Sequence, residues 1–85
     1  IINSFSFYKN QIEILDLSNY IKLKSINEYA FSDNPLKEIK ILDNIEIEYH
    51  DNNDIWNNFV ICYLKNNKKA GDYKLENDEW KWYPL

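Results

Sequence analysis

Apolar residues recur with a fixed spacing along the first half of the chain. A shift of 24 positions, the distance from Phe7 to Phe31, lays the sequence on itself with apolar residues matched to apolar residues. The matched pairs include Ile2 with Ile26, Phe7 with Phe31, Ile12 with Leu36, Leu15 with Ile39, Leu17 with Ile41 and Ile21 with Ile45. The pattern predicts that residues 1–45 consist of about two copies of one structural unit.

Each copy contains one short segment with the alternation of a strand. The spacing L-x-x-L-x-L appears as Ile12-x-x-Leu15-x-Leu17 and again as Leu36-x-x-Ile39-x-Ile41. Successive side chains of a strand face opposite sides, so the L-x-L residues should point into the core. The residues beside them, predicted to form an exposed ligand-binding strip of mixed charge, are Glu13, Ile14, Asp16, Glu38 and Lys40.

A period of about 20–29 residues with this spacing is typical of leucine-rich repeats. The segment LDLSNYIKLKSINEYAFSDNPLKEIKILDNI, from Leu15 to Ile45, resembles the BspA-like subclass of bacterial leucine-rich-repeat proteins. The likeness is carried by the step SI-x-x-YAF followed by N-x-L-x-x-I-x-I. Asn27 stands where the subclass usually has Gly, and Leu42 where it usually has Pro.

The resemblance implies both a fold and a function. The expected fold is an α/β solenoid fragment, with about two leucine-rich repeats and short parallel strands. The expected function is non-catalytic protein–protein recognition by a bacterial protein located at the cell surface or outside the cell. The partner would be a protein, since a solenoid presents an extended surface for binding other molecules.

The pattern changes after Ile45. The alternation of IEIEYH predicts one last strand, and DNND predicts a loop. Apolar residues at helical spacing predict a helix over about 54–65. Asn77 and Asp78 predict the two-residue turn of a hairpin over about 72–83, with Leu75 opposite Trp80 and Tyr73 opposite Trp82.

An aromatic helix and hairpin would suit the C-terminal cap of a solenoid, because its last repeat would otherwise expose apolar side chains. We therefore expect one structural unit, with repeats and the last strand in residues 1–50 and the cap in residues 51–85. The predicted cap core consists of Trp56, Phe59 and Trp80, packed on Ile39, Ile41 and Ile45.

Composition narrows the possible partners. The 85 residues carry a formal net charge of -4, which argues against nucleic acid, whose phosphates require a basic surface. No apolar run approaches the ~20 residues of a membrane span. The chain begins at Ile1 and contains no Met, so we expect it to be a piece of a longer protein.

The candidate catalytic and metal-binding residues form weak patterns. His50, with acidic neighbours, lacks the mostly Cys and His ligand set of a structural zinc site. An EF-hand loop counted from Asp51 would place Trp56 and Cys62 where Gly and Glu are needed. Cys62 is the lone cysteine and has no oriented base beside it. We therefore predict no catalytic residue, no metal and no cofactor, and a protein that is not an enzyme.

Two further expectations concern binding surfaces. Tyr73, Trp80, Trp82 and Tyr83 leave open an alternative, a carbohydrate-binding module that stacks sugars on its hairpin. Burial of Trp80 and Trp82 would favour the cap. At the other end, an open apolar edge should allow self-association. Its residues are Ile2, Phe5, Phe7, Ile12, Leu15 and Leu17.

Overall fold

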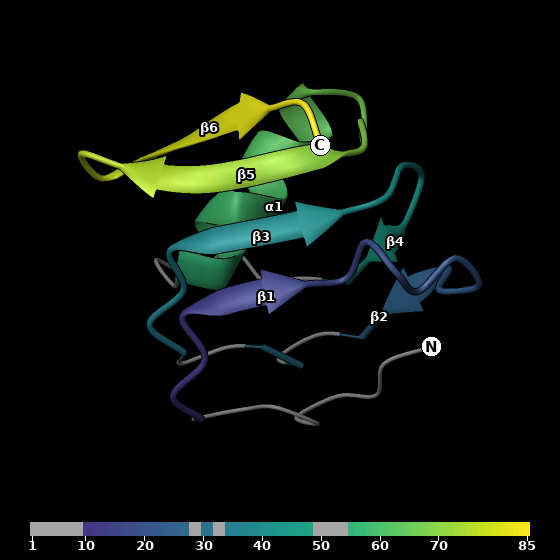
Figure 1. Ribbon diagram of the computed structural model, residues 1–85, viewed down its shortest axis with the longest axis horizontal. Coiled ribbons are helices and arrows are strands. Elements are labelled where there is room, and N and C mark those ends of the chain that lie inside the picture. Colours follow the sequence, from purple (N-terminus) through teal and green to yellow (C-terminus); the bar gives the residue numbers. More distant parts are fainter. Residues whose placement is uncertain (1–9, 28–29, 32–33, 49–54) are drawn as a thin grey trace.

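A four-stranded mixed sheet packed against one helix organises the described part of the chain (Figure 1). The computed structural model describes residues 10–27, 30–31, 34–48 and 55–85. The elements in these ranges are β1 (Ile14–Asp16), β2 (Ser25–Ile26), β3 (Glu38–Ile41), β4 (Glu46–Ile47), α1 (Ile55–Lys65), β5 (Gly71–Glu76) and β6 (Glu79–Tyr83).

The strand order of the large sheet is β1-β3-β5-β6. β1 pairs with β3 in parallel, with Leu15 opposite Ile39. β5 takes the other side of β3 in the antiparallel direction, with Tyr73 opposite Ile39. β2 and β4 form a separate two-stranded parallel sheet in which Ile26 lies opposite Ile47.

The prediction of an α/β solenoid fragment is wrong. The described residues form a small mixed-sheet domain, and the hairpin does not lie across the end of a stack of repeats. It instead extends the sheet sideways from β3, and the Leu75 amide donates to the Lys37 carbonyl at 2.8 Å. The pairing with β5 satisfies the backbone groups on the second edge of β3. It also places Tyr73 beside Ile39, so that both side chains are buried on one apolar face.

Among the described residues, the internal repeat has its structural counterpart in the pairing of β1 with β3. Ile14 pairs with Glu38, an offset of 24 residues (38 − 14), which equals the shift found in the sequence. In the second sheet Ser25 pairs with Glu46, an offset of 21 (46 − 25). Stacking of equal repeats would require the same offset between every two paired strands. The two offsets differ, so the strands do not stack in this way.

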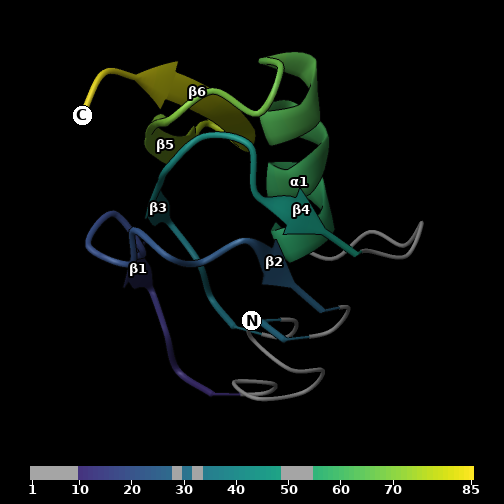
Figure 2. The same cartoon turned by 90° about the vertical axis from the view of Figure 1, so that its right-hand side faces the viewer.

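The helix covers one face of the sheet (Figure 2). It was predicted over 54–65 and runs from Ile55 to Lys65, so this prediction is confirmed for the described residues. Its buried apolar residues are Trp56, Phe59, Val60 and Tyr63, at the spacing of one helix face. The helix ends where Asn67 and Lys68 adopt positive φ angles of 57° and 54°.

Phe59 is the centre of an aromatic cluster between helix and sheet. Its ring centroid lies 5.1 Å from that of Trp56 and 5.8 Å from that of Tyr63, both on the helix. The rings of Tyr73 and Trp80, from the two strands of the hairpin, meet Phe59 edge-on at 5.4 and 5.5 Å. Trp56 and Phe59 share one core cluster with Ile39, Ile41 and Ile45, and Trp80 is partly buried against it, although helix and hairpin do not cap a solenoid.

Two buried phenols connect this core to the backbone. The Tyr63 hydroxyl donates to the Leu42 carbonyl at 2.8 Å and accepts from the Ile45 amide at 3.1 Å. The Tyr73 hydroxyl donates to the Lys69 carbonyl at 2.6 Å. Burial raises the pKa of both phenols above the ordinary value. The Tyr63 bonds fix the segment between β3 and β4 against the helix, and the Tyr73 bond fixes the segment between α1 and β5 against β5.

The predicted hairpin is confirmed in both its turn and its register. Asn77 and Asp78 have φ angles of 51° and 64°, as a two-residue turn with two left-handed residues requires. Leu75 lies opposite Trp80, and Tyr73 lies opposite Trp82, as expected from the alternation.

Replacement of Phe59 by Ala should strongly destabilise the fold. The Phe59 side chain is fully buried, so we expect Phe59→Ala to lower the free energy of unfolding by about 3–5 kcal/mol. Ile61→Ala, on the exposed side of the same helix, should cost less than about 1 kcal/mol. Urea unfolding of both variants measures the difference. Similar losses in the two variants would contradict the central position of Phe59.

Candidate functional site

The side of the four-stranded sheet opposite α1 is its outer face, and no described element covers it in Figure 2. The strand register aligns eight outward-pointing residues into two rows across the sheet. The first row is Ile14, Glu38, Lys74 and Lys81, and the second is Asp16, Lys40, Asp72 and Tyr83.

Four of the five predicted ligand-binding residues lie in these rows. Ile14 and Asp16 are exposed on β1, while Glu38 and Lys40 are half-buried on β3. Glu13 precedes β1 and lies at the margin, where its carboxylate is 3.1 Å from the Lys37 ammonium group. The structure therefore brings the predicted strip together, with one member displaced to its end.

The sequence analysis missed the other half of the face. Asp72 and Lys74 of β5, with Lys81 and Tyr83 of β6, continue both rows beyond β3. The polar alternation of the hairpin was visible in the sequence, but its pairing with β3 was not. Since the hairpin was expected to cap a solenoid, its polar side was not joined to the strip.

Asp16 and Glu38, two acidic residues of the outer face, differ in their bonding. Asp16 accepts hydrogen bonds at Oδ1 from the Ser18 hydroxyl at 2.5 Å and the Ser18 amide at 2.9 Å. These bonds lower the pKa of Asp16, so its carboxylate stays ionised and tied to its own turn. The pKa of Glu38 is shifted in the opposite direction. A hydrogen bond with the Asp72 carboxyl group raises the pKa of Glu38, with further increases from burial and the charge of Asp72.

Glu38 and Asp72 form a carboxyl pair across β3 and β5. Asp72 Oδ1 is buried and receives no hydrogen bond from a donor, while Oδ2 lies 3.9 Å from Lys74 Nζ. Two ionised carboxylates both act as acceptors, so the Glu38–Asp72 bond exists only when one of them holds a proton. When both carboxyl groups are ionised, the pair is a point of charge repulsion on the outer face.

The residues considered for metal binding or catalysis lie only partly within the described part of the chain. Among the described residues, no three His, Cys, Asp or Glu side chains group closely enough to hold a metal ion. His50 and Asp51 lie outside the described residues. The Cys62 thiol is half-buried, and burial raises its pKa, which keeps it protonated and poorly nucleophilic at neutral pH.

The aromatic hairpin presents little ring surface to solvent. Tyr73 is fully buried, and Trp80 is half-buried against Phe59. The Trp82 indole donates to the Ala70 carbonyl at 3.1 Å, and Lys69 Nζ lies 3.9 Å from its ring centroid. Tyr83 is the exposed ring of the four, and it points to the outer face. The hairpin thus lacks a platform of several rings for a sugar.

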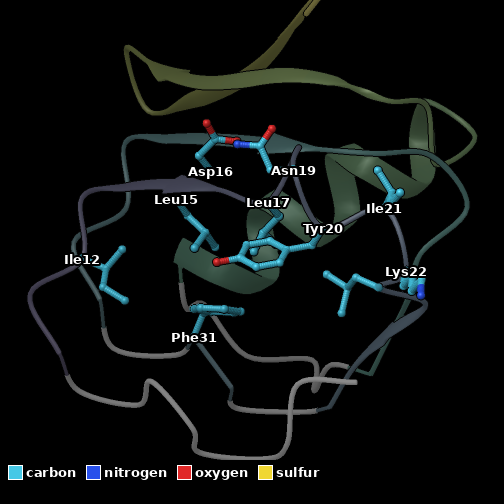
Figure 3. A pocket seen from close by; sticks show the side chains of 10 residues that line it. Ile12, Leu15, Asp16, Leu17, Asn19, Tyr20, Ile21, Lys22 and Phe31 are labelled. Carbon is cyan, nitrogen blue, oxygen red and sulfur yellow. The ribbon is translucent and has the colours of Figure 1, made fainter.

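An apolar cavity of about 690 Å³ lies beside β1 (Figure 3), and we call it the edge cavity. It is lined by Ile12, Leu15, Leu17, Leu23 and Phe31, with Asp16, Asn19, Tyr20, Ile21 and Lys22 around them. The predicted open edge contained Ile12, Leu15 and Leu17, whereas its residues Ile2, Phe5 and Phe7 lie outside the described residues. The loop residues Tyr20 and Ile21 were not predicted to be part of it.

Compared with known proteins, the chain matches no protein-family model, no curated protein and no solved structure. The resemblance to BspA-like proteins therefore stays a prediction. In the described ranges, the structure contains no helix with the length and apolar character needed to cross a membrane.

Replacement of Glu38 by Gln should stabilise the protein in a pH-dependent way. The pKa of Glu38 is raised in the folded state above its ordinary value of 4.5. The stability contributed by its proton is therefore complete below about pH 4.5 and lost as the pH rises through the folded pKa. A Gln amide would donate to Asp72 at every pH, so Glu38→Gln should raise the free energy of unfolding at pH 7, by less than about 1 kcal/mol at this partly exposed site.

Thermal unfolding between pH 3.5 and pH 8 measures this effect, with Glu48→Gln as the control of equal charge change at an exposed position. The gain of Glu38→Gln should shrink toward acidic pH. Equal gains in both variants, or a gain that does not change with pH, would contradict the carboxyl pair.

Proposed function

We propose that this protein is a non-catalytic recognition module that binds a protein partner through the outer face of its four-stranded sheet. The observation that carries the proposal is the pair of rows of outward side chains, which extends over all four strands and which no described element covers. Strands hold such side chains in fixed positions, so the face is preorganised for binding.

The composition of the face suits a protein partner. Ile14 at one end of the rows and Tyr83 at the other are exposed large apolar side chains that a partner could bury. Between them, Asp16, Lys40 and Asp72 alternate in charge. Buried apolar and aromatic contacts supply most of the affinity at protein interfaces, while complementary charges fix orientation and exclude wrong partners.

Two other considerations support this reading over catalysis. The Glu38–Asp72 pair lies on an open sheet surface, whereas catalytic carboxylates usually work in concave sites that exclude water. The sequence between Leu15 and Ile45 resembles bacterial surface proteins that recognise other proteins. We accordingly propose that the protein acts at the bacterial cell surface or outside the cell.

A double variant of the outer face tests the proposal. Protein fragments displayed on yeast are selected for binding to the parent protein, and the purified binders are then measured by calorimetry. Ile14→Ser combined with Tyr83→Ser removes the two exposed apolar side chains of the face. Loss of a single interface hot spot costs about 2 kcal/mol, so we expect binding to weaken by at least about 30-fold.

The matched control is Ile61→Ser combined with Leu64→Ser, which removes two exposed apolar side chains from α1. Its affinity should remain within about twofold of the parent, well below the effect of one hot-spot residue. Binders that tolerate the outer-face variant as well as the control would contradict the proposal. A parent protein that yields no protein binder but binds a glycan array through Trp80 and Trp82 would support the carbohydrate alternative.

A further inference from the structure

We infer that the outer face takes up a proton at Glu38 and Asp72 when a protein partner covers it, so that binding strengthens as the pH falls. The inference rests on the proposed function, because it concerns the same face, and it adds how binding at that face is regulated. The two can fail separately, since binding at the outer face does not by itself require any dependence on pH.

The strand register brings the two carboxyl groups together on the outer face. Glu38 of β3 lies opposite Lys74 of β5. Asp72 lies two residues before Lys74, so it is the diagonal neighbour of Glu38 on the same face. The Asp72 side chain is only 13% exposed, and its buried Oδ1 atom receives no hydrogen bond from a donor. Most of the Asp72 carboxyl surface is therefore removed from water before any partner binds.

Other charged groups surround this pair on every strand of the sheet. In the described ranges, the remaining charged and titratable residues of the outer face are Asp16 on β1, Lys40 on β3, Lys74 and Glu76 on β5, and Glu79, Lys81 and Tyr83 on β6. The hydrogen bond with Asp72 raises the pKa of Glu38 most, and burial and the charge of Asp72 raise it further. The charges of Lys74 and Lys40 lower this pKa by less, so the net shift is upward.

A partner that covers the face strengthens the preference of the pair for a proton. Covering removes water from the carboxyl groups, which penalises their ionised form. Two adjacent carboxylates both carry this penalty and also repel each other. When one of them holds a proton, a hydrogen bond replaces the repulsion, and one negative charge remains near Lys74. The covered pair therefore holds a larger share of one proton than the free pair.

The positions of two lysines argue against a cation of the partner in place of the proton. Lys74 lies directly opposite Glu38. Lys40 lies directly opposite Asp72. A basic side chain aimed at the pair would approach both ammonium groups, and like charges at short range repel. A proton binds to the carboxyl group itself and needs no space between the lysines.

The direction of the pH dependence follows from the number of bound protons. A complex that binds more protons than its free components gains affinity as the pH falls. The gain begins as the pH falls through the pKa of the covered pair. It is complete below the pKa of the free pair, which for Glu38 lies above the ordinary 4.5. Uptake of half a proton changes the dissociation constant about threefold per pH unit.

Binders from the yeast selection test the inference, provided that Ile14→Ser with Tyr83→Ser weakens them and that they contain no His. Calorimetry between pH 5 and pH 8, in two buffers of different ionisation enthalpy, measures the affinity and the protons taken up. The affinity of the parent should rise about threefold per pH unit at its steepest, toward acidic pH. Glu38→Gln should lose most of this dependence, because its amide supplies the hydrogen bond without a proton.

Glu48→Gln is the control, because it removes the same charge at an exposed residue away from the outer face. It should keep the pH dependence of the parent. Equal pH dependence in the parent and Glu38→Gln would overturn the inference. Proton release by the parent would also overturn it, since a cation of the partner would then contact the pair. A selection that yields no binder of the outer face would contradict the proposed function, and this inference would fail with it.

Discussion

The antiparallel pairing of β3 with β5 joins the two halves of the molecule. It places Tyr73 beside Ile39, so that the parallel half of the sheet and the C-terminal hairpin share one apolar face against α1. Both side chains are fully buried, and the Phe59 ring packs edge-on against Tyr73. The helix thus finds a surface wide enough for its aromatic residues, which neither half of the sheet would offer alone.

The same pairing creates the outer face. Because residues alternate along each strand, aligning Ile39 with Tyr73 on the inner side also aligns Glu38 with Lys74 and Lys40 with Asp72 on the outer side. The unfavourable proximity of the Glu38 and Asp72 carboxyl groups is a consequence of this alignment. Packing of the core determines the strand register, and the register then determines which polar residues are neighbours on the outer face.

The sequence predicts features that depend on neighbouring residues. The helix follows from apolar spacing that ends at Tyr63, and the hairpin follows from Asn77 and Asp78, which tolerate positive φ angles. The alignment of Leu15 with Ile39 also follows, since the two strands carry similar sequences at a fixed offset.

The overall architecture could not be predicted in this way. The similarity of the two strand segments, β1 and β3, does not determine which strand pairs with the other edge of β3. The alternation of apolar and polar residues in the hairpin is compatible with either a cap or a strand of the sheet. Tyr73 lies 34 residues (73 − 39) beyond Ile39, and no local pattern connects them. For the same reason, half of the outer face was predicted, while Asp72, Lys74, Lys81 and Tyr83 were not assigned to it.

The buried phenols of Tyr63 and Tyr73 also limit the alkaline tolerance of this fold. Each hydroxyl donates its proton to a backbone carbonyl, and burial holds the pKa above the ordinary value of 10.0. The unfolded chain releases these protons first as the pH rises, so strong base favours unfolding through both residues. The aromatic cluster that gives a small core its cohesion therefore makes the protein sensitive to base.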